Sequence, residues 1–392
     1  MQLQDYFAAE RKRFPATADI AYFMTASTGL IPDYVHEGIS AYQEARYRRG
    51  GDSRWRDGED SMAMMYRSKC QMADMLGCGP EDIAFAANTT QALSYFTGNL
   101  SITPGDNVVI PDNLFETGRY LWQVRKADGL EIRRAKTKNG VLAPEALTQL
   151  VDERTVAVFC DYVESDTGFR LDAATVGKFC RERGVPFILD AAQAAGALPL
   201  NVQDLYVDML AGNDYKWMLN YCGTGFVYIR KELRQSIQQK SAGWMSADDV
   251  SSADDLVLRQ DAGRFELGFP NVSGIYGLGL VAERYCALGA QTIERYLAEL
   301  RSYLCQQVEL TSGLRLRYHF RQENQSQIVC LLADSTLHIT DQQLWQRRAV
   351  CDLKGSDPQT GELILRVALH YYNTKEDIDR LILAIQGCRQ GA

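Results

Sequence analysis

Between about residues 60 and 230, short apolar runs alternate with longer stretches whose apolar positions recur at helical spacing. The helical stretches are 66–76, a helix from Thr90, 117–127, 143–151 and 173–183, and the apolar runs are 82–86, 107–110, 130–133, 156–159, 185–189, 207–212 and 225–229. Strands that alternate with helices are typical of an α/β fold in which a parallel sheet is covered on both faces. The pattern therefore predicts a mainly parallel, doubly wound sheet.

The regular alternation of predicted strands and helices ends after residue 229. Residues 246–255 are polar and acidic, with no periodic apolar face, and are predicted to form a surface loop. Two long helices (276–288 and 292–310), two strands (327–332 and 363–368) and a last helix (375–386) are expected to follow. These elements predict a smaller α+β domain. Since 392 residues exceed the usual size of one domain, we divide the chain into a large domain of 18–284 and a small domain of 1–17 and 285–392.

Composition excludes several classes of function. The chain has 42 basic and 50 acidic side chains, a formal net charge of -8 and no long basic run, which argues against nucleic-acid and membrane-surface partners. The first residues lack the apolar core of a signal peptide, and no run of about 18 apolar residues occurs, so we expect a cytoplasmic protein. Ten cysteines without a C-x-x-C pair indicate neither a metal site nor a disulfide framework.

Two apolar runs end in groups that fit one cofactor. Asp190 closes the run 185–189, and Lys216 follows the run 207–212. The carboxyl ends of parallel strands meet at one edge of a sheet, where α/β proteins bind ligands. An amine that condenses with an aldehyde, beside an acid that pairs with a protonated pyridine nitrogen, is what pyridoxal 5'-phosphate requires. Lys216 and Asp190 are therefore the predicted catalytic residues; a solvated lysine and a helix-capping aspartate are the competing interpretations.

The remaining needs of this cofactor have candidates as well. Thr89 and Thr90, which follow a strand and open a helix, are placed to bind a phosphate, although threonine is also an ordinary helix cap. Asn213 and Tyr215, on either side of residue 214, are expected to add hydrogen bonds to that phosphate. Gln193, one helical turn beyond Asp190, is expected to bind the ring hydroxyl.

Two further side chains complete the predicted site. Phe115 follows the strand 107–110, so its ring is placed to stack on the pyridine, with a core position as the alternative. Arg366 lies in the apolar strand 363–368, and its planar guanidinium suits a substrate carboxylate, with a plain salt bridge as the alternative.

Taken together, these motifs resemble the class V aminotransferase family. They are Asn88-Thr89-Thr90, Thr167-Gly168, Asp190-Ala191-Ala192-Gln193 with Gly196, Asp208, Tyr215-Lys216-Trp217, Gly223-Thr224-Gly225, Arg264-Phe265-Glu266 with Gly268-Phe269-Pro270-Asn271, and Arg366 with Tyr372-Asn373-Thr374. The family contains cysteine desulfurases, selenocysteine lyases, kynureninases and isopenicillin N epimerase-like proteins. The resemblance implies a fold type I homodimer, with Gly268 and Phe269 approaching the neighbouring subunit's phosphate.

Departures from the desulfurase pattern bear on the reaction. Tyr215 and Phe115 stand where desulfurases have histidines. The segment around Glu164 differs from the asparagine-bearing desulfurase motif, and Glu164 is expected to face the substrate. Cys351 lies fifteen residues before Arg366, near the place of the persulfide cysteine, yet Ala349-Val350 looks like a strand that enters this loop, so Cys351 is expected at a strand end.

The sequence thus predicts a pyridoxal-phosphate enzyme that acts on an α-amino acid through a Lys216 Schiff base. A Cβ lyase of the desulfurase or kynureninase kind, without a clear persulfide cysteine, is favoured. An aminotransferase and an isopenicillin N epimerase-like racemase remain open, as does a non-catalytic binding protein. A nicotinamide-dependent oxidoreductase is disfavoured, since no predicted strand is followed by G-x-G-x-x-G.

Overall fold

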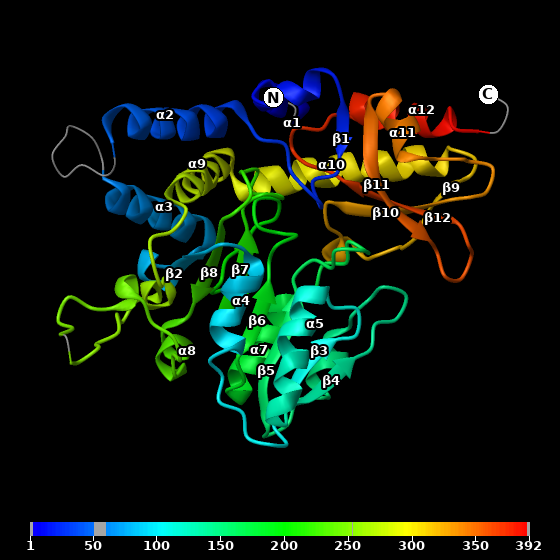
Figure 1. Cartoon of the computed structure of the whole chain (residues 1–392). Coiled ribbons are helices and arrows are strands. Elements are labelled where there is room, and N and C mark those ends of the chain that lie inside the picture. Colours follow the sequence, from blue (N-terminus) through cyan, green and yellow to red (C-terminus); the bar gives the residue numbers. More distant parts are fainter. Residues whose placement is uncertain (1–2, 51–59, 253, 390–392) are drawn as a thin grey trace.

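In the computed structural model, which describes residues 3–50, 60–252 and 254–389, two β-sheets organise the protein (Figure 1). The larger sheet has seven strands in the order β2-β8-β7-β6-β5-β3-β4, and the smaller has five in the order β1-β11-β12-β10-β9. The two sheets lie in different halves of the molecule, with the long helix α10 (Ala290–Glu309) beside the smaller one.

The larger sheet is mainly parallel, as predicted. Its strands are β2 (Ile83–Ala86), β3 (Asn107–Pro111), β4 (Glu131–Ala135), β5 (Thr155–Asp161), β6 (Phe187–Asp190), β7 (Met209–Asn213) and β8 (Gly225–Ile229). β8 runs antiparallel to both of its neighbours, β7 and β2, whereas β3 to β7 pair in parallel. β8 is the antiparallel strand of this mainly parallel sheet, because a short connection, 214–224, turns the chain straight back beside β7.

Helices cover both faces of this sheet. They are α3 (Ser61–Leu76), α4 (Thr89–Thr97), α5 (Glu116–Gln123), α6 (Pro144–Thr148), α7 (Ala173–Arg183), α8 (Lys231–Ser236) and α9 (Val272–Leu288). Neighbouring strand residues such as Phe159 and Cys160 belong to two different hydrophobic cores, because successive side chains point to opposite faces. Burial on both faces explains why these strands read as continuous apolar runs.

The smaller sheet draws on both ends of the chain. Its strands are β1 (Ala21–Phe23), β9 (Leu314–Leu316), β10 (Ile328–Ala333), β11 (Ala349–Ser356) and β12 (Leu363–Ala368). The other helices are α1 (Leu3–Arg11), α2 (Asp33–Arg49), α11 (Asp341–Gln346) and α12 (Lys375–Gln386). β1 pairs in parallel with β11.

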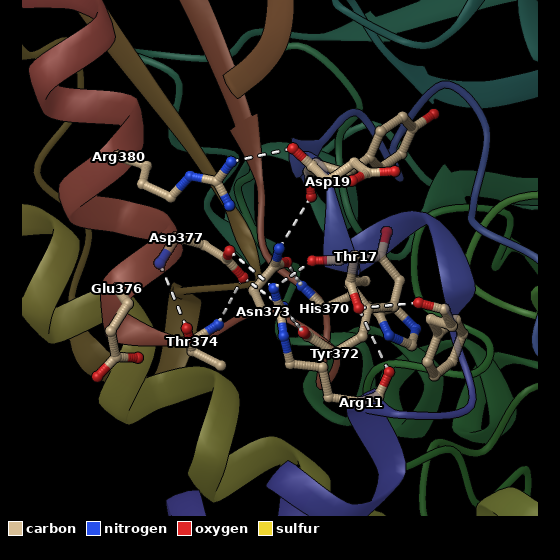
Figure 2. A network of polar contacts seen from close by, with 12 residues as sticks. Arg11, Thr17, Asp19, His370, Tyr372, Asn373, Thr374, Glu376, Asp377 and Arg380 are labelled. Atoms are coloured by element: carbon tan, nitrogen blue, oxygen red, sulfur yellow. Dashed lines mark hydrogen bonds and ion pairs between the residues drawn. The ribbon is translucent and has the colours of Figure 1, made fainter. Parts of the chain in front are cut away.

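Polar contacts hold the N-terminal segment against α12 (Figure 2). Arg11 donates to the carboxylate of Asp377 and to the carbonyl oxygen of Thr17, and Arg380 Nη2 donates to the carbonyl oxygen of Asp19 at 3.0 Å. β1 belongs to the small sheet, although the large domain was expected to begin at residue 18. The domain division stays a prediction.

Other boundaries differ in how well they were predicted. α7, β8, β12 and α12 begin and end where the sequence indicated, whereas α6 is shorter than the expected 143–151. Within 246–255 the described residues form no strand, but they include the end of a short 3₁₀ turn and an isolated β-bridge from Ala247 to Leu258. Residue 253 lies outside the described part. Cys351 is not at a strand end, because β11 continues to Ser356.

None of the helices in the described part of the chain has the length and hydrophobicity that crossing a membrane requires.

Candidate active site

A pocket of about 90 Å³ lies at the carboxyl edge of the larger sheet. All of the expected cofactor-binding residues except Gly268 and Phe269 contribute to its wall. The lining residues are Asn88, Thr89, Thr90, Phe115, Thr117, Asp161, Val163, Ser165, Asp190, Ala192, Gln193, Asn213, Tyr215 and Lys216. Segments spread over more than 120 positions of the chain meet here, because the strands β5, β6 and β7 end at one edge.

Lys216 stands between two aromatic rings in the connection after β7. Its Nζ lies 5.6 Å from the ring centroid of Phe115 and 5.9 Å from that of Tyr215. The side chain of Asn213 accepts a hydrogen bond from the Lys216 backbone N–H at 3.3 Å, which fixes the turn that presents the amine. Burial lowers the pKa of Lys216, and the negative charge of Asp190 offsets part of this shift. A lowered pKa increases the fraction of neutral, nucleophilic amine.

Asp190 ends β6 and projects into the same pocket. Its Oδ1 accepts the backbone N–H of Ala192 at 2.8 Å. Burial raises the pKa of Asp190, while this hydrogen bond and the charge of Lys216 lower it. A cationic partner in the pocket would stabilise the ionised form further, so the side chain suits a protonated ring nitrogen.

The start of α4 is where a phosphate was expected to bind. Asn88 caps the helix by accepting the N–H of Gln91 at 2.9 Å, so the free N–H groups of the first turn remain directed at the pocket. Thr89 Oγ1 is buried and has no hydrogen-bond partner among the described residues. Thr90 Oγ1 is 3.1 Å from Thr117 Oγ1. An unpaired buried hydroxyl at a helix N-terminus fits a phosphate group.

Gln193 lines the pocket, but its amide is already engaged. Its Nε2 donates to the carbonyl oxygen of Ala26 at 3.0 Å, and its Oε1 accepts the Trp217 Nε1–H at 2.8 Å. One amide hydrogen is left for a ligand. The expected hydrogen bond to a ring hydroxyl therefore stays a prediction.

Asp161 is a pocket residue that the sequence reasoning missed. It ends β5, and its Oδ2 accepts the backbone N–H of Phe115 at 3.1 Å. Burial raises the pKa of Asp161 well above its usual range, and the neighbouring charge of Asp190 raises it further. The signal was available, because Asp161 follows an apolar run just as Asp190 does.

Glu164 and Arg366, the two expected substrate-binding residues, do not line the pocket. The Glu164 carboxylate accepts the backbone N–H groups of Asp166 at 3.0 Å and Thr167 at 2.7 Å, so it stabilises its own loop, and its expected role toward a substrate stays a prediction. Arg366 is 4% exposed, and its Nη1 donates at 2.9 Å to the carbonyl oxygen of Ser165, a residue of the pocket wall. Its positive charge helps to lower the pKa of Lys216, and its expected contact with a substrate carboxylate stays a prediction.

The remaining candidates also lie outside this pocket. Gly268 and Phe269 line a separate cavity of about 270 Å³, and Phe269 is 48% exposed, so their expected approach to a second subunit stays a prediction. Cys351 is buried within β11, and burial raises the pKa of its thiol. Among the described residues, no group of three or more His, Cys, Asp and Glu side chains is arranged to hold a metal ion.

Comparison with known proteins agrees with this geometry. Residues 21–381 match the family described as Aminotransferase class-V. A probable cysteine desulfurase of Methanothermobacter thermautotrophicus is 24% identical over 382 residues, which are 95% of each chain. The solved apo structure of a cysteine desulfurase from Thermococcus onnurineus NA1 is 23% identical, with a TM-score of 0.85 over 97% of this chain and 98% of that chain. The cystine C-S lyase C-DES, solved in complex with its reaction product cysteine persulfide, is 21% identical, with a TM-score of 0.87 over 96% of this chain and 100% of that chain.

The fold comparison supports what the residues show, namely an amine, an acid and an anion site in one pocket. Lys216, Asp190 and the unpaired hydroxyl of Thr89 suit the aldehyde, the ring nitrogen and the phosphate of one cofactor. The predicted fold type I is confirmed. The chain belongs to the class V aminotransferase family, whose members are pyridoxal-phosphate-dependent lyases and transferases, and the predicted family, enzyme class and cofactor are thereby confirmed.

Proposed function

We propose that this pyridoxal-phosphate enzyme acts as a lyase on a sulfur-containing α-amino acid, and that it breaks the bond between Cβ and sulfur by elimination. The observation that carries the proposal is that no cysteine contributes to the pocket wall, although all ten lie in the described part of the chain. Relatives described as cysteine desulfurases and a neighbour described as a cystine C-S lyase support a sulfur-containing substrate.

The residues of the pocket have distinct roles in this reaction. Bound pyridoxal phosphate withdraws electrons from the substrate Cα. Lys216 holds the aldehyde of the cofactor and, once a substrate amine replaces it, moves the proton at Cα as general base. Asp190 keeps the ring nitrogen protonated. Thr89, Thr90 and Asn213 bind the phosphate, and the ring of Phe115 covers one face of the site.

Cys351 and Cys330, the two buried cysteines of the strands around Arg366, argue against transfer of the sulfur to the protein. Such a transfer needs a thiolate near the substrate. Cys351 is 1% exposed and its pKa is raised by burial, and residues 354–362, which connect the central part of β11 to β12, contain no cysteine. Cys330 is buried as well, and its pKa is raised to about 12 by burial.

We also infer that the enzyme is a cytoplasmic homodimer. Ten free thiols, half of them buried, are compatible with a reducing compartment. The exposed ring of Phe269, beside the cavity that it lines with Gly268, offers a surface for a second subunit. Sedimentation analysis at several protein concentrations tests the dimer.

The reaction is tested by analysing the products from L-cysteine and L-cystine. Elimination from L-cystine consumes one water and releases pyruvate, ammonia and cysteine persulfide, and L-cysteine gives pyruvate, ammonia and sulfide. We expect pyruvate and ammonia in equal amounts. Alanine as the main product would instead indicate desulfuration, amino-group transfer to a 2-oxo acid would indicate an aminotransferase, and an inverted Cα would indicate an epimerase; each of these outcomes overturns the proposal.

A further inference from the structure

The guanidinium of Arg366 already holds a carboxylate. Arg366 Nε and Nη2 donate to Oδ2 of Asp352 at 3.1 and 2.8 Å. The two residues are cross-strand partners in the antiparallel pairing of β11 and β12. Their side chains are 5% and 10% exposed, so solvent hardly screens this ion pair.

A third residue completes the arrangement. Ser27, which follows β1, donates its hydroxyl to Asp352 Oδ1 at 2.9 Å and accepts a hydrogen bond from Arg366 Nη2 at 2.7 Å. Arg366 Nη1 donates to the carbonyl oxygen of Ser165, a residue of the pocket wall. Of the five N–H groups of a guanidinium, four are thereby engaged.

Arg366 therefore has no two neighbouring N–H groups that are free. A carboxylate binds arginine most strongly through two parallel hydrogen bonds, which need two neighbouring N–H groups. A substrate carboxylate at Arg366 must therefore take a donor from Asp352, and it must approach a second negative charge. Like charges at such short range disfavour binding strongly.

We propose that Asp352 is a specificity-determining residue: it occupies Arg366 in place of a substrate carboxylate and weakens the binding of amino-acid carboxylates to this site. The proposal rests on the proposed function only in taking an α-amino acid as the substrate and in placing its carboxylate at Arg366, which contacts the pocket wall at Ser165. A purely structural role for Asp352 makes a different prediction, because loss of the ion pair would then lower stability without improving the binding of any anion.

Binding of propionate to the holoenzyme, followed by calorimetry in chloride-free buffer, tests the proposal without depending on the reaction. Asp352→Asn keeps the size of the side chain and its ability to accept hydrogen bonds, but leaves the buried Arg366 charge without a counterion. We expect propionate to bind at least about tenfold more tightly to this variant than to the unmodified protein. Addition of Arg366→Leu should abolish the gain.

Two further variants guard the interpretation. Asp357→Asn removes another largely buried carboxylate of the small domain, which pairs with Arg317 at 3.0 Å, and should leave propionate binding unchanged. Ser27→Ala removes the hydroxyl that donates to Asp352 and accepts from Arg366, and should give a smaller gain of about threefold. This variant tests the proposal even where Asp352→Asn does not fold. Unaltered propionate affinity in the folded Asp352 and Ser27 variants, or a gain that survives Arg366→Leu, overturns the proposal. The proposed reaction is tested separately, by the products formed from L-cystine, and does not depend on how propionate binds.

Discussion

Asp161 and Asp190 are cross-strand partners in the parallel register of β5 and β6, and both side chains line the pocket that holds Lys216. Two carboxyl groups at such a position do not both ionise easily, because each charge opposes the other. Burial and the charge of Asp190 raise the pKa of Asp161 well above its usual range. Since Lys216 also lowers the pKa of Asp190, we expect Asp190 rather than Asp161 to carry the negative charge of the pair.

Replacement of Asp161 separates its charge from its hydrogen bond. Asp161→Asn resembles the protonated acid and keeps an oxygen for the Phe115 N–H, so we expect its affinity for pyridoxal phosphate to stay within about twofold of the original. Asp161→Ala leaves that N–H without its acceptor and should weaken cofactor binding about tenfold. Absorbance titration of the apoprotein measures both constants. Equal losses in the two variants would show that Asp161 acts through its charge.

Removal of Lys216 tests the central assignment of the pocket. Lys216→Ala should lose covalent attachment of the cofactor and should lower kcat by about 10²- to 10⁴-fold, since general acid–base catalysis contributes effects of this size. Mass spectrometry after borohydride reduction shows whether the cofactor is attached. Lys354→Ala is the matched control. Lys354 is also near the pocket, since its charge helps to lower the pKa of Lys216, but its amine pairs with Asp166 at 3.0 Å, so the cofactor should stay attached in this variant. Cofactor attached to the Lys216 variant after reduction would refute the assignment.

The parts of the site that the sequence predicted share one physical origin. Lys216, Asp190, Phe115 and Thr89 all follow apolar strands, and the carboxyl ends of parallel strands meet at one edge. A residue that directly follows an apolar strand can therefore be placed at this edge of the sheet from the sequence alone. Asp161 obeys the same rule, but the cofactor requires only one acid at its ring nitrogen, so its chemistry assigns no role to a second one.

What could not be predicted depends on pairing between distant segments. That Asp352 faces Arg366 follows from the register of β11 and β12, which includes an irregularity between Leu353 and Ser356 that no periodicity reveals. Likewise, β1 joins the small sheet through contacts with residues more than 300 positions away, so local sequence gave no hint of it. The loop bonds of Glu164 are equally invisible, because an acid in a turn reads the same whether it faces a ligand or its own backbone.

Cys351 offers a direct test of sulfur transfer to the protein. Because its thiol is buried in β11 and its pKa is raised by burial, Cys351→Ala should leave kcat/KM for C–S cleavage within about twofold of the original value. The free energy of unfolding should fall by about 1 kcal/mol, through the loss of a small buried side chain. Steady-state kinetics and urea denaturation measure the two quantities. A loss of activity much larger than the loss of stability would restore Cys351 as a nucleophile.

Asp214, two residues before Lys216, should make the stability of the protein depend on pH. The side chain is fully buried, and burial raises its pKa from 3.8 to about 8, although contacts with Thr224 lower it. The folded protein therefore binds this proton more tightly than the unfolded chain, so the free energy of unfolding falls as the pH rises between these two values. For a shift of this size the fall is on the order of 2 to 5 kcal/mol. The Asn side chain of Asp214→Asn does not titrate. The urea midpoint of this variant should therefore change less between about pH 5 and pH 8 than that of the unmodified protein. Parallel pH profiles for the two proteins would mean that Asp214 is ionised in the folded state, with a cation or donor satisfying it.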